Sequence, residues 1–240
     1  MHNLSLTKLS TAKKCVFVEG EDMKILQKFY NIIYPDNPDS FDIIPSLPLG
    51  GFKKINEAFG AAKLFNENAG ENFKCYAVLD RDYYIGNHIE SIQEKAKENC
   101  LILHVWSKKE LENYLINPKV IYKIIADCCE KYEDFILKFE NLVNSFKDDV
   151  IDSYTTKIHE DDRKLTAGTA ASKARDYVDG KWNCLENKLS IVPGKELLKT
   201  VNKWIKDDYK VSCSMNTIFN NMELDDIDSE IKELLKKIIE

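Results

Sequence analysis

The chain has 240 residues, of which 44% are hydrophobic, and its 34 basic and 40 acidic side chains give a formal net charge of −6. This composition is typical of a globular protein and excludes a disordered chain, which would bury too little apolar surface to offset its entropy. No run of 18 apolar residues is present, which excludes a membrane-spanning helix of ordinary length. The acidic total argues against a module that coats duplex nucleic acid through a basic surface, but it allows an enzyme whose acidic residues bind cations.

The seven cysteines are scattered through the chain, and none forms a CxxC pair. This distribution predicts reduced, mostly buried thiols rather than disulfides or a zinc site. The first ten residues are polar and lack the apolar run of a secretory signal. We therefore expect a cytoplasmic protein with no membrane partner.

The first 115 residues alternate between short apolar runs and segments with helical spacing. Because the apolar runs are nearly continuous, they indicate a mostly parallel sheet covered by helices on both faces. The predicted strands are Lys14–Glu19, Asp42–Pro45, Phe73–Leu79 and Cys100–Val105, and the predicted helices between them are Asp22–Tyr34, Lys53–Asn66 and His88–Asn99. The fold class expected is α/β.

After Lys108 the spacing of apolar residues is helical. Helices are predicted over Lys109–Leu115, Lys119–Glu130, Tyr132–Tyr154, from Pro193 to about Lys206, and over Asp225–Glu240. We expect an α/β core over residues 13–118 and a helical region over residues 119–240.

Carboxylates follow two of the predicted strands. Glu19 ends the first strand and precedes Gly20, and Asp80 and Asp82 follow the third strand in the segment VLDRDYY. The carboxyl ends of parallel strands meet at one edge of the sheet, where ligands bind. Two carboxylates two residues apart in extended chain point the same way. Because like charges at short range raise each other's pKa, such a cluster favours bound Mg²⁺ ions suited to phosphodiester chemistry.

These residues carry a resemblance to a known family. Val18-Glu19-Gly20-Glu21-Asp22, followed after a later strand by Leu79-Asp80-Arg81-Asp82, resembles a TOPRIM domain, the metal-dependent fold of topoisomerases, bacterial primases and OLD (overcoming lysogenisation defect) nucleases. The segment WSKKELENYLINP at Trp106–Pro118 resembles the TOPRIM part of OLD-like ATPase–nucleases and related phage-defence effectors. IVPGKELL at Ile191–Leu198 resembles the segment that carries a catalytic lysine in those proteins.

The resemblance implies a role for each acidic residue in these motifs. Glu19 is expected to be a metal ligand or general base, with Asp80 and Asp82 as further ligands. Glu110 or Glu112 would complete the metal shell; both lie at the edge of the same predicted helix face, so spacing leaves the choice open, and we favour Glu112. Lys195, near a helix start, is expected to stabilise negative charge on a phosphate.

One position departs from the family pattern. Many relatives place an aspartate four residues after the glutamate, where this chain has Met23. Asp22 lies one residue earlier, about 100° around a helix, so Asp22 or Glu21 takes over the role or one metal site is weakened.

The function implied is that of a divalent-metal-dependent DNA endonuclease or nickase in an OLD-like anti-phage defence system. Two Mg²⁺ ions are expected, which Mn²⁺ or Ca²⁺ can replace in binding. The sequence has no GxxxxGK[ST] motif, so we expect the chain to work with an ATPase domain or partner, through which it could form a homo-oligomer.

Two other functions remain open from the sequence. A haloacid-dehalogenase-like phosphatase would use Asp80 as nucleophile and Asp82 as general acid, although that fold usually begins with its Asp-x-Asp strand. A TOPRIM-like module with a degraded metal site would instead regulate an ATPase or sense a phage protein, and Met23 favours it.

Overall fold

The computed structural model describes residues 12–37, 41–69, 73–128 and 131–240. These residues form two compact units. Unit 1 contains the described residues up to Asp80 together with Ile85–Trp106 and Glu223–Glu240, and unit 2 contains Arg81–Tyr84 and Ser107–Met222.

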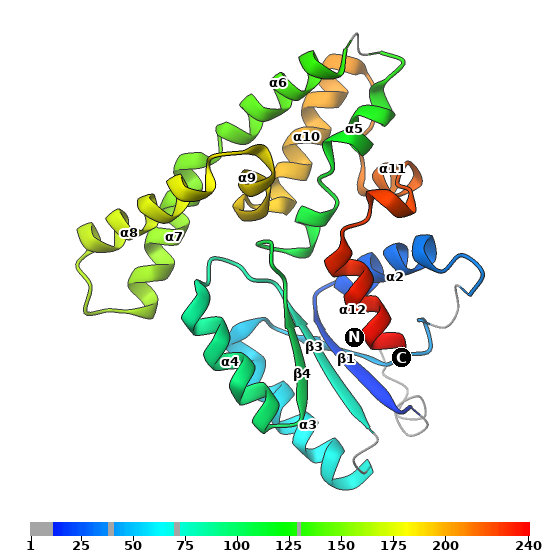
Figure 1. Ribbon diagram of the computed structural model, residues 1–240, viewed down its shortest axis with the longest axis vertical. Helices are drawn as coiled ribbons and strands as arrows, with labels where there is room; N and C mark the ends of the chain where they lie inside the picture. Colours follow the sequence, from blue (N-terminus) through cyan, green and yellow to red (C-terminus); the bar gives the residue numbers. More distant parts are fainter. Residues whose placement is uncertain (1–11, 38–40, 70–72, 129–130) are drawn as a thin grey trace. The chain divides into compact units, whose positions relative to one another are not determined.

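Unit 1 is built on a four-stranded, all-parallel sheet (Figure 1). Its strands are β1 (Lys14–Glu19), β2 (Ser46–Leu49), β3 (Lys74–Leu79) and β4 (Leu101–Val105), in the order β2-β1-β3-β4. The central strands are buried on both faces, which explains their continuous apolar runs. The predicted α/β class with a parallel sheet is confirmed.

The helices of unit 1 follow the strands closely along the chain. They are α2 (Asp22–Ile33), α3 (Ile55–Ala69), which follows the 3₁₀ turn η2 (Phe52–Lys54), and α4 (Gly86–Glu98). Because crossovers between parallel strands are right-handed, the strand order places α2 on one face of the sheet and α3 and α4 on the other. The predicted helices therefore exist, with ends shifted by a few residues.

The second predicted strand, Asp42–Pro45, is wrong. The chain turns at this point, with the Ile44 N–H donating to the Phe41 carbonyl at 3.1 Å, and Ile43 is 69% exposed. Strand β2 begins only at Ser46 and includes Pro48, which an edge strand tolerates because one side of it needs no backbone donor.

The C-terminal segment belongs to unit 1. After the 3₁₀ turn η4 (Leu224–Asp226), helix α12 (Ser229–Ile239) packs next to α2. Lys14 Nζ donates to the Ile238 carbonyl at 2.8 Å, and Tyr76 Oη donates to the Lys237 carbonyl at 2.9 Å. Since Lys14 and Tyr76 lie at alternate positions that share one face of the sheet, α12 covers this face together with α2.

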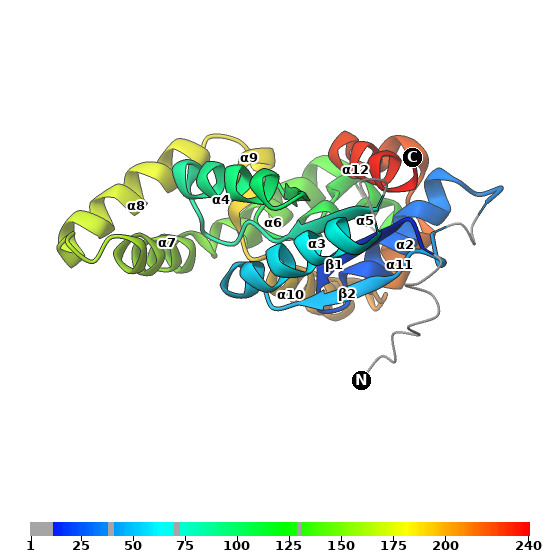
Figure 2. The same cartoon turned by 90° about the horizontal axis from the view of Figure 1, so that it is seen from below.

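Unit 2 is helical. Figure 2 shows two of its helices, α7 (Lys147–Asp161) and α8 (Ala167–Lys181), side by side, and Tyr154 and Tyr177 pack between them with ring centroids 4.8 Å apart. The other elements of unit 2 are η3 (Leu111–Tyr114), α5 (Pro118–Ile125), α6 (Tyr132–Asn144), α9 (Leu185–Ile191), α10 (Gly194–Tyr209) and α11 (Met215–Asn220).

Several helix predictions in unit 2 need correction. The helix predicted over Lys109–Leu115 is only the 3₁₀ turn η3. The single helix predicted over Tyr132–Tyr154 is divided at Ser145–Phe146 into α6 and α7. Residue 130, the predicted end of the helix from Lys119, lies outside the described residues.

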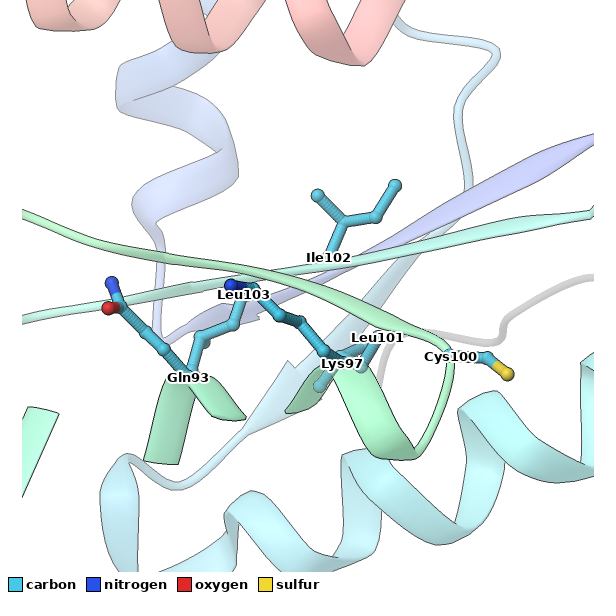
Figure 3. Close-up of a pocket in the computed structure, with 6 residues that line it drawn as sticks. All are labelled: Gln93, Lys97, Cys100, Leu101, Ile102 and Leu103. Carbon is cyan, nitrogen blue, oxygen red and sulfur yellow. The ribbon is translucent and has the colours of Figure 1, made fainter. Parts of the chain in front are cut away.

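A groove of about 540 Å³ lies between α4 and the outer strand β4 (Figure 3). It is lined by Gln93, Lys97, Cys100, Leu101, Ile102 and Leu103. None of these six residues is acidic or belongs to the motifs above, so this groove is not the site that the sequence predicts. Among the described residues, no helix is both long and apolar enough to cross a membrane.

Candidate metal centre

In unit 1 two predicted site residues end neighbouring strands. Glu19 is the last residue of β1, and Asp80 follows the last residue of β3; the two strands pair in parallel with Phe17 opposite Ala77. Gly51 faces the Glu19 carboxylate so closely that a methyl group on it would lie 3.3 Å from Oε2. With φ at +70°, Gly51 also takes a backbone conformation that favours glycine. The glycine turn therefore makes room for the carboxylate that ends β1.

Asp22 is the first residue of α2 and is only 3% exposed. A carboxylate in the first turn of a helix is favoured by the positive end of the helix dipole. Met23, at the position where the resembling family has an aspartate, is the second residue of the same helix. Asp22 is therefore the buried carboxylate that this segment offers.

Three of the predicted ligands come together. Asp80, Glu110 and Glu112 each offer a carboxylate oxygen, and these oxygens all lie within 4.8 Å of one another. All three residues are buried, with 4% to 5% of their surface exposed. Burying three carboxylates together is unfavourable unless cations or donors compensate them. The cluster could hold a metal ion.

The segment that carries Glu110 and Glu112 is held by one buried asparagine. Asn113 Nδ2 donates to the carbonyls of Leu189 and Val192, each at 2.8 Å, and its Oδ1 accepts from the Glu110 N–H at 3.0 Å. All three hydrogen bonds are inside unit 2. They join η3 to the end of α9, so the position of both glutamates depends on a side chain that is 1% exposed.

Gly194 allows α10 to begin against this asparagine. A methyl group on Gly194 would lie 2.8 Å from the Asn113 backbone nitrogen and 2.8 Å from its Oδ1. Real Cβ atoms do not approach other atoms so closely, and buried interiors have little free space to relax into. Only glycine therefore fits at the first position of α10.

Glu110 serves as the anion at the start of α10. Its Oε1 accepts from the Lys195 backbone N–H at 2.5 Å, and its Oε2 accepts from Lys109 Nζ at 2.9 Å. The amide of Lys195, which the sequence led us to associate with phosphate, thus donates to a carboxylate of the chain itself. Each Glu110 oxygen keeps a second lone pair with which it could still bind a cation.

Glu112 is in a different electrostatic environment. Burial raises the pKa of Glu112, and the charge of Lys195 opposes this effect. Lys195 Nζ lies 3.6 Å from Glu112 Oε2, and the lysine side chain is 51% exposed. Glu112 is therefore paired with a half-exposed lysine.

Asp82 does not continue the extended chain of β3. Its φ is +49°, and its side chain is 48% exposed. The expectation that Asp80 and Asp82 point the same way assumed an extended backbone, which this turn interrupts. Burial raises the pKa of Asp82, the charge of Lys109 lowers it, and Glu110 raises it again.

The structure brings some of the predicted residues together and not others. Asp80, Glu110 and Glu112 share a cluster, Lys195 contacts Glu112, and Glu19, Asp22 and Asp82 are not members of the three-residue group. Sequence reasoning missed the two side chains that organise the segment, Lys109 and Asn113. Both lie inside the KKELENYL motif. The partners of Asn113, Leu189 and Val192, are distant in the sequence, and the contact of Lys109 with Asp82 depends on the turn at Asp82.

Comparisons with known proteins give few matches. No model of a known protein family matches the sequence, and no curated protein matches it. Two solved structures, both of the C-terminal region of the Xanthomonas campestris pv. campestris OLD protein, match over nearly the whole chain with 13% sequence identity. One covers 97% of this chain and 94% of that chain with a TM-score of 0.40, and the other covers 95% of each with a TM-score of 0.37.

Proposed function

We propose that the protein is a divalent-metal-dependent phosphodiester hydrolase, a TOPRIM-type DNA endonuclease or nickase. The observation that carries this proposal is the buried cluster of Asp80, Glu110 and Glu112, whose oxygens lie within 4.8 Å of one another. All three residues lie in the motifs that resemble those of OLD-like nucleases, and that resemblance implies that they are metal ligands.

The donor set fits a hard divalent cation. Mg²⁺ and Mn²⁺ prefer carboxylate oxygens, and all three residues of the cluster are carboxylates. When bound, such an ion lowers the pKa of a water molecule and neutralises charge on a phosphate. Asp80 and Glu112 would hold the ion with Glu110 beside them, and Glu19 and Asp22 are further candidates at the edge of the sheet in unit 1.

Lys195 is suited to contact the substrate phosphate. Its side chain is half-exposed, and its ammonium group already lies beside a carboxylate that the ion would engage. A cation that leaves Glu112 for the phosphate stabilises the negative charge that develops during cleavage. By the same resemblance, we place the activity in an OLD-like anti-phage defence system that works with an ATPase domain or partner.

Cleavage of supercoiled plasmid DNA tests this proposal. Nicking or linearisation is expected with Mg²⁺ or Mn²⁺, and it should be lost in Asp80→Asn and in Glu112→Gln. The matched control is Glu94→Gln, which removes an exposed carboxylate from α4 and should leave cleavage unchanged. If no divalent-dependent cleavage occurs even with an ATPase partner present, the nuclease function is refuted and a regulatory module is favoured. A covalent phosphate on Asp80 would instead indicate the phosphatase.

A further inference from the structure

Lys109 is a buried lysine at the edge of the acidic cluster, and nothing in the proposed chemistry uses it. Only 7% of its surface is exposed. A lysine is rarely buried unless its charge is compensated, because removing an ammonium group from water is costly. The groups around its Nζ therefore explain its position.

Acidic groups and an aromatic ring surround this ammonium group. Lys109 Nζ lies 2.9 Å from Glu110 Oε2, 3.8 Å from Asp82 Oδ1 and 4.8 Å from the centroid of the Tyr83 ring. Tyr83 is in turn held edge-on by Tyr154, with centroids 4.9 Å apart. All of these residues belong to unit 2.

The backbone of Lys109 is fixed on both sides. Its N–H donates to the Ser190 carbonyl at 2.7 Å, and its own carbonyl accepts from the Asp82 N–H at 2.8 Å. The second bond also ties the turn at Asp82 to the segment that begins η3. The ammonium group is thus placed between two carboxylates by hydrogen bonds that do not involve its side chain.

We propose that Lys109 is a built-in cation that occupies the place of a second metal ion, so that the acidic cluster takes one divalent cation instead of two. This inference rests on the proposed function, because it assumes that the cluster binds a divalent cation at all. Asp82 and one oxygen of Glu110 are then partners of Lys109, while Asp80 and Glu112 would hold the ion.

The charge balance of the segment supports a single ion. When ionised, Asp80, Asp82, Glu110 and Glu112 carry four negative charges, and Lys109 and Lys195 place two positive charges within 4 Å of the last three. The two negative charges left over match one dication. A second dication placed between Asp82 and Glu110 would lie next to the Lys109 ammonium group, and repulsion between like charges at such a distance opposes binding. The ammonium group also cannot leave easily, because its stem is buried.

Titration of the whole chain with Mn²⁺, followed by calorimetry and by the spin resonance of free Mn²⁺, tests the inference without reference to activity. One ion per chain is expected for the wild type. Two ions per chain would overturn the inference and leave the proposed function intact, whereas no bound ion would overturn the proposed function itself.

Two variants separate Lys109 from its neighbours. Asp82→Asn, at a half-exposed position, should change Mn²⁺ affinity less than threefold. Glu112→Gln should weaken Mn²⁺ affinity by about tenfold or more, which is the usual effect of mutating a residue that supports a metal site. If Asp82→Asn weakens binding as much as Glu112→Gln does, Asp82 is a ligand and the inference is wrong.

Lys109→Met removes the charge and keeps the length of the side chain. A second Mn²⁺ is expected in this variant, while Lys109→Arg and the matched control Lys108→Met should still bind one. Lys108 stacks over the Tyr114 ring, with its Nζ 4.3 Å from the centroid. A folded Lys109→Met chain that binds only one ion would contradict the inference. If this variant does not fold, as circular dichroism would show, the wild-type count and the Asp82→Asn result decide.

Discussion

Replacing Gly194 by alanine should destabilise unit 2 and displace the carboxylate segment. The added methyl group would lie 2.8 Å from two atoms of Asn113 and 2.9 Å from a third. Asn113 cannot move aside without loss, because its side chain makes hydrogen bonds to Glu110, Leu189 and Val192. The clash is therefore relieved either by moving α10 or by breaking these bonds.

The size of the effect follows from the contacts. Forcing an extra carbon into a filled interior costs about 1–3 kcal/mol. Losing one of the Asn113 hydrogen bonds adds about 1 kcal/mol. The higher helix propensity of alanine returns at most about 1 kcal/mol. We expect a net loss of about 1–3 kcal/mol in the free energy of unfolding.

Urea unfolding followed by circular dichroism measures this loss. The matched control is Gly180→Ala in α8, where an added Cβ meets no atom within 4 Å, and this variant should be as stable as the wild type or up to about 1 kcal/mol more stable. Gly194→Ala should also weaken Mn²⁺ binding, because Glu110 depends on the same contacts. If Gly194→Ala is as stable as Gly180→Ala, the close packing of α10 on Asn113 is refuted.

Three further predictions concern charge and packing. Burial raises the pKa of Glu112, so its ionised form destabilises the metal-free fold as pH rises through that pKa; Glu112→Gln should therefore raise the urea midpoint at pH 7, and the gain should vanish in acid, where both side chains are neutral. Lys195→Met should abolish plasmid cleavage and change stability by less than about 0.5 kcal/mol, since the side chain is half-exposed; a large loss of stability in the same urea assay would contradict this. Leu235→Ala, at a fully buried position of α12, should cost about 2–5 kcal/mol in thermal or urea unfolding, and Lys236→Ala should cost little.

The parts of the fold that the sequence predicts well are those whose environment is uniform. Strands β1 and β3 are buried on both faces, so nearly every residue in them is apolar and the segments are easy to recognise. Strand β2 has only four residues and contains Pro48, and Ile43, an apolar residue in the segment predicted as a strand, is exposed. Helix α11 (Met215–Asn220) was not predicted, because six residues are too few to show a helical period.

The candidate site could be predicted in its residue types but not in their roles. Spacing on a helix could not separate Glu110 from Glu112, because the segment is a 3₁₀ turn in which Glu110 is the residue before the first turn. The roles come instead from contacts across the chain. Glu110 accepts from the amide of Lys195, 85 residues later, and Asn113 donates to carbonyls 76 and 79 residues later. No local pattern carries that information.

Glu110 and Glu112 therefore have opposite effects on the stability of the metal-free protein. Glu110 has both oxygens engaged by donors of unit 2, so its charge stabilises the fold. Removing it would leave the first turn of α10 without its anion and would leave Lys109 with the more distant Asp82. Glu112 is buried beside other carboxylates, and the lysine near it, Lys195, is half-exposed, so its charge is a cost that a bound cation would offset. Variants at these two positions should therefore separate the effect on folding from the effect on metal binding. Glu110→Gln should lower stability with or without Mn²⁺. Glu112→Gln should raise stability without Mn²⁺ and remove the stabilisation that Mn²⁺ gives to the wild type. Equal effects at both positions, in either condition, would show that the two carboxylates share one role.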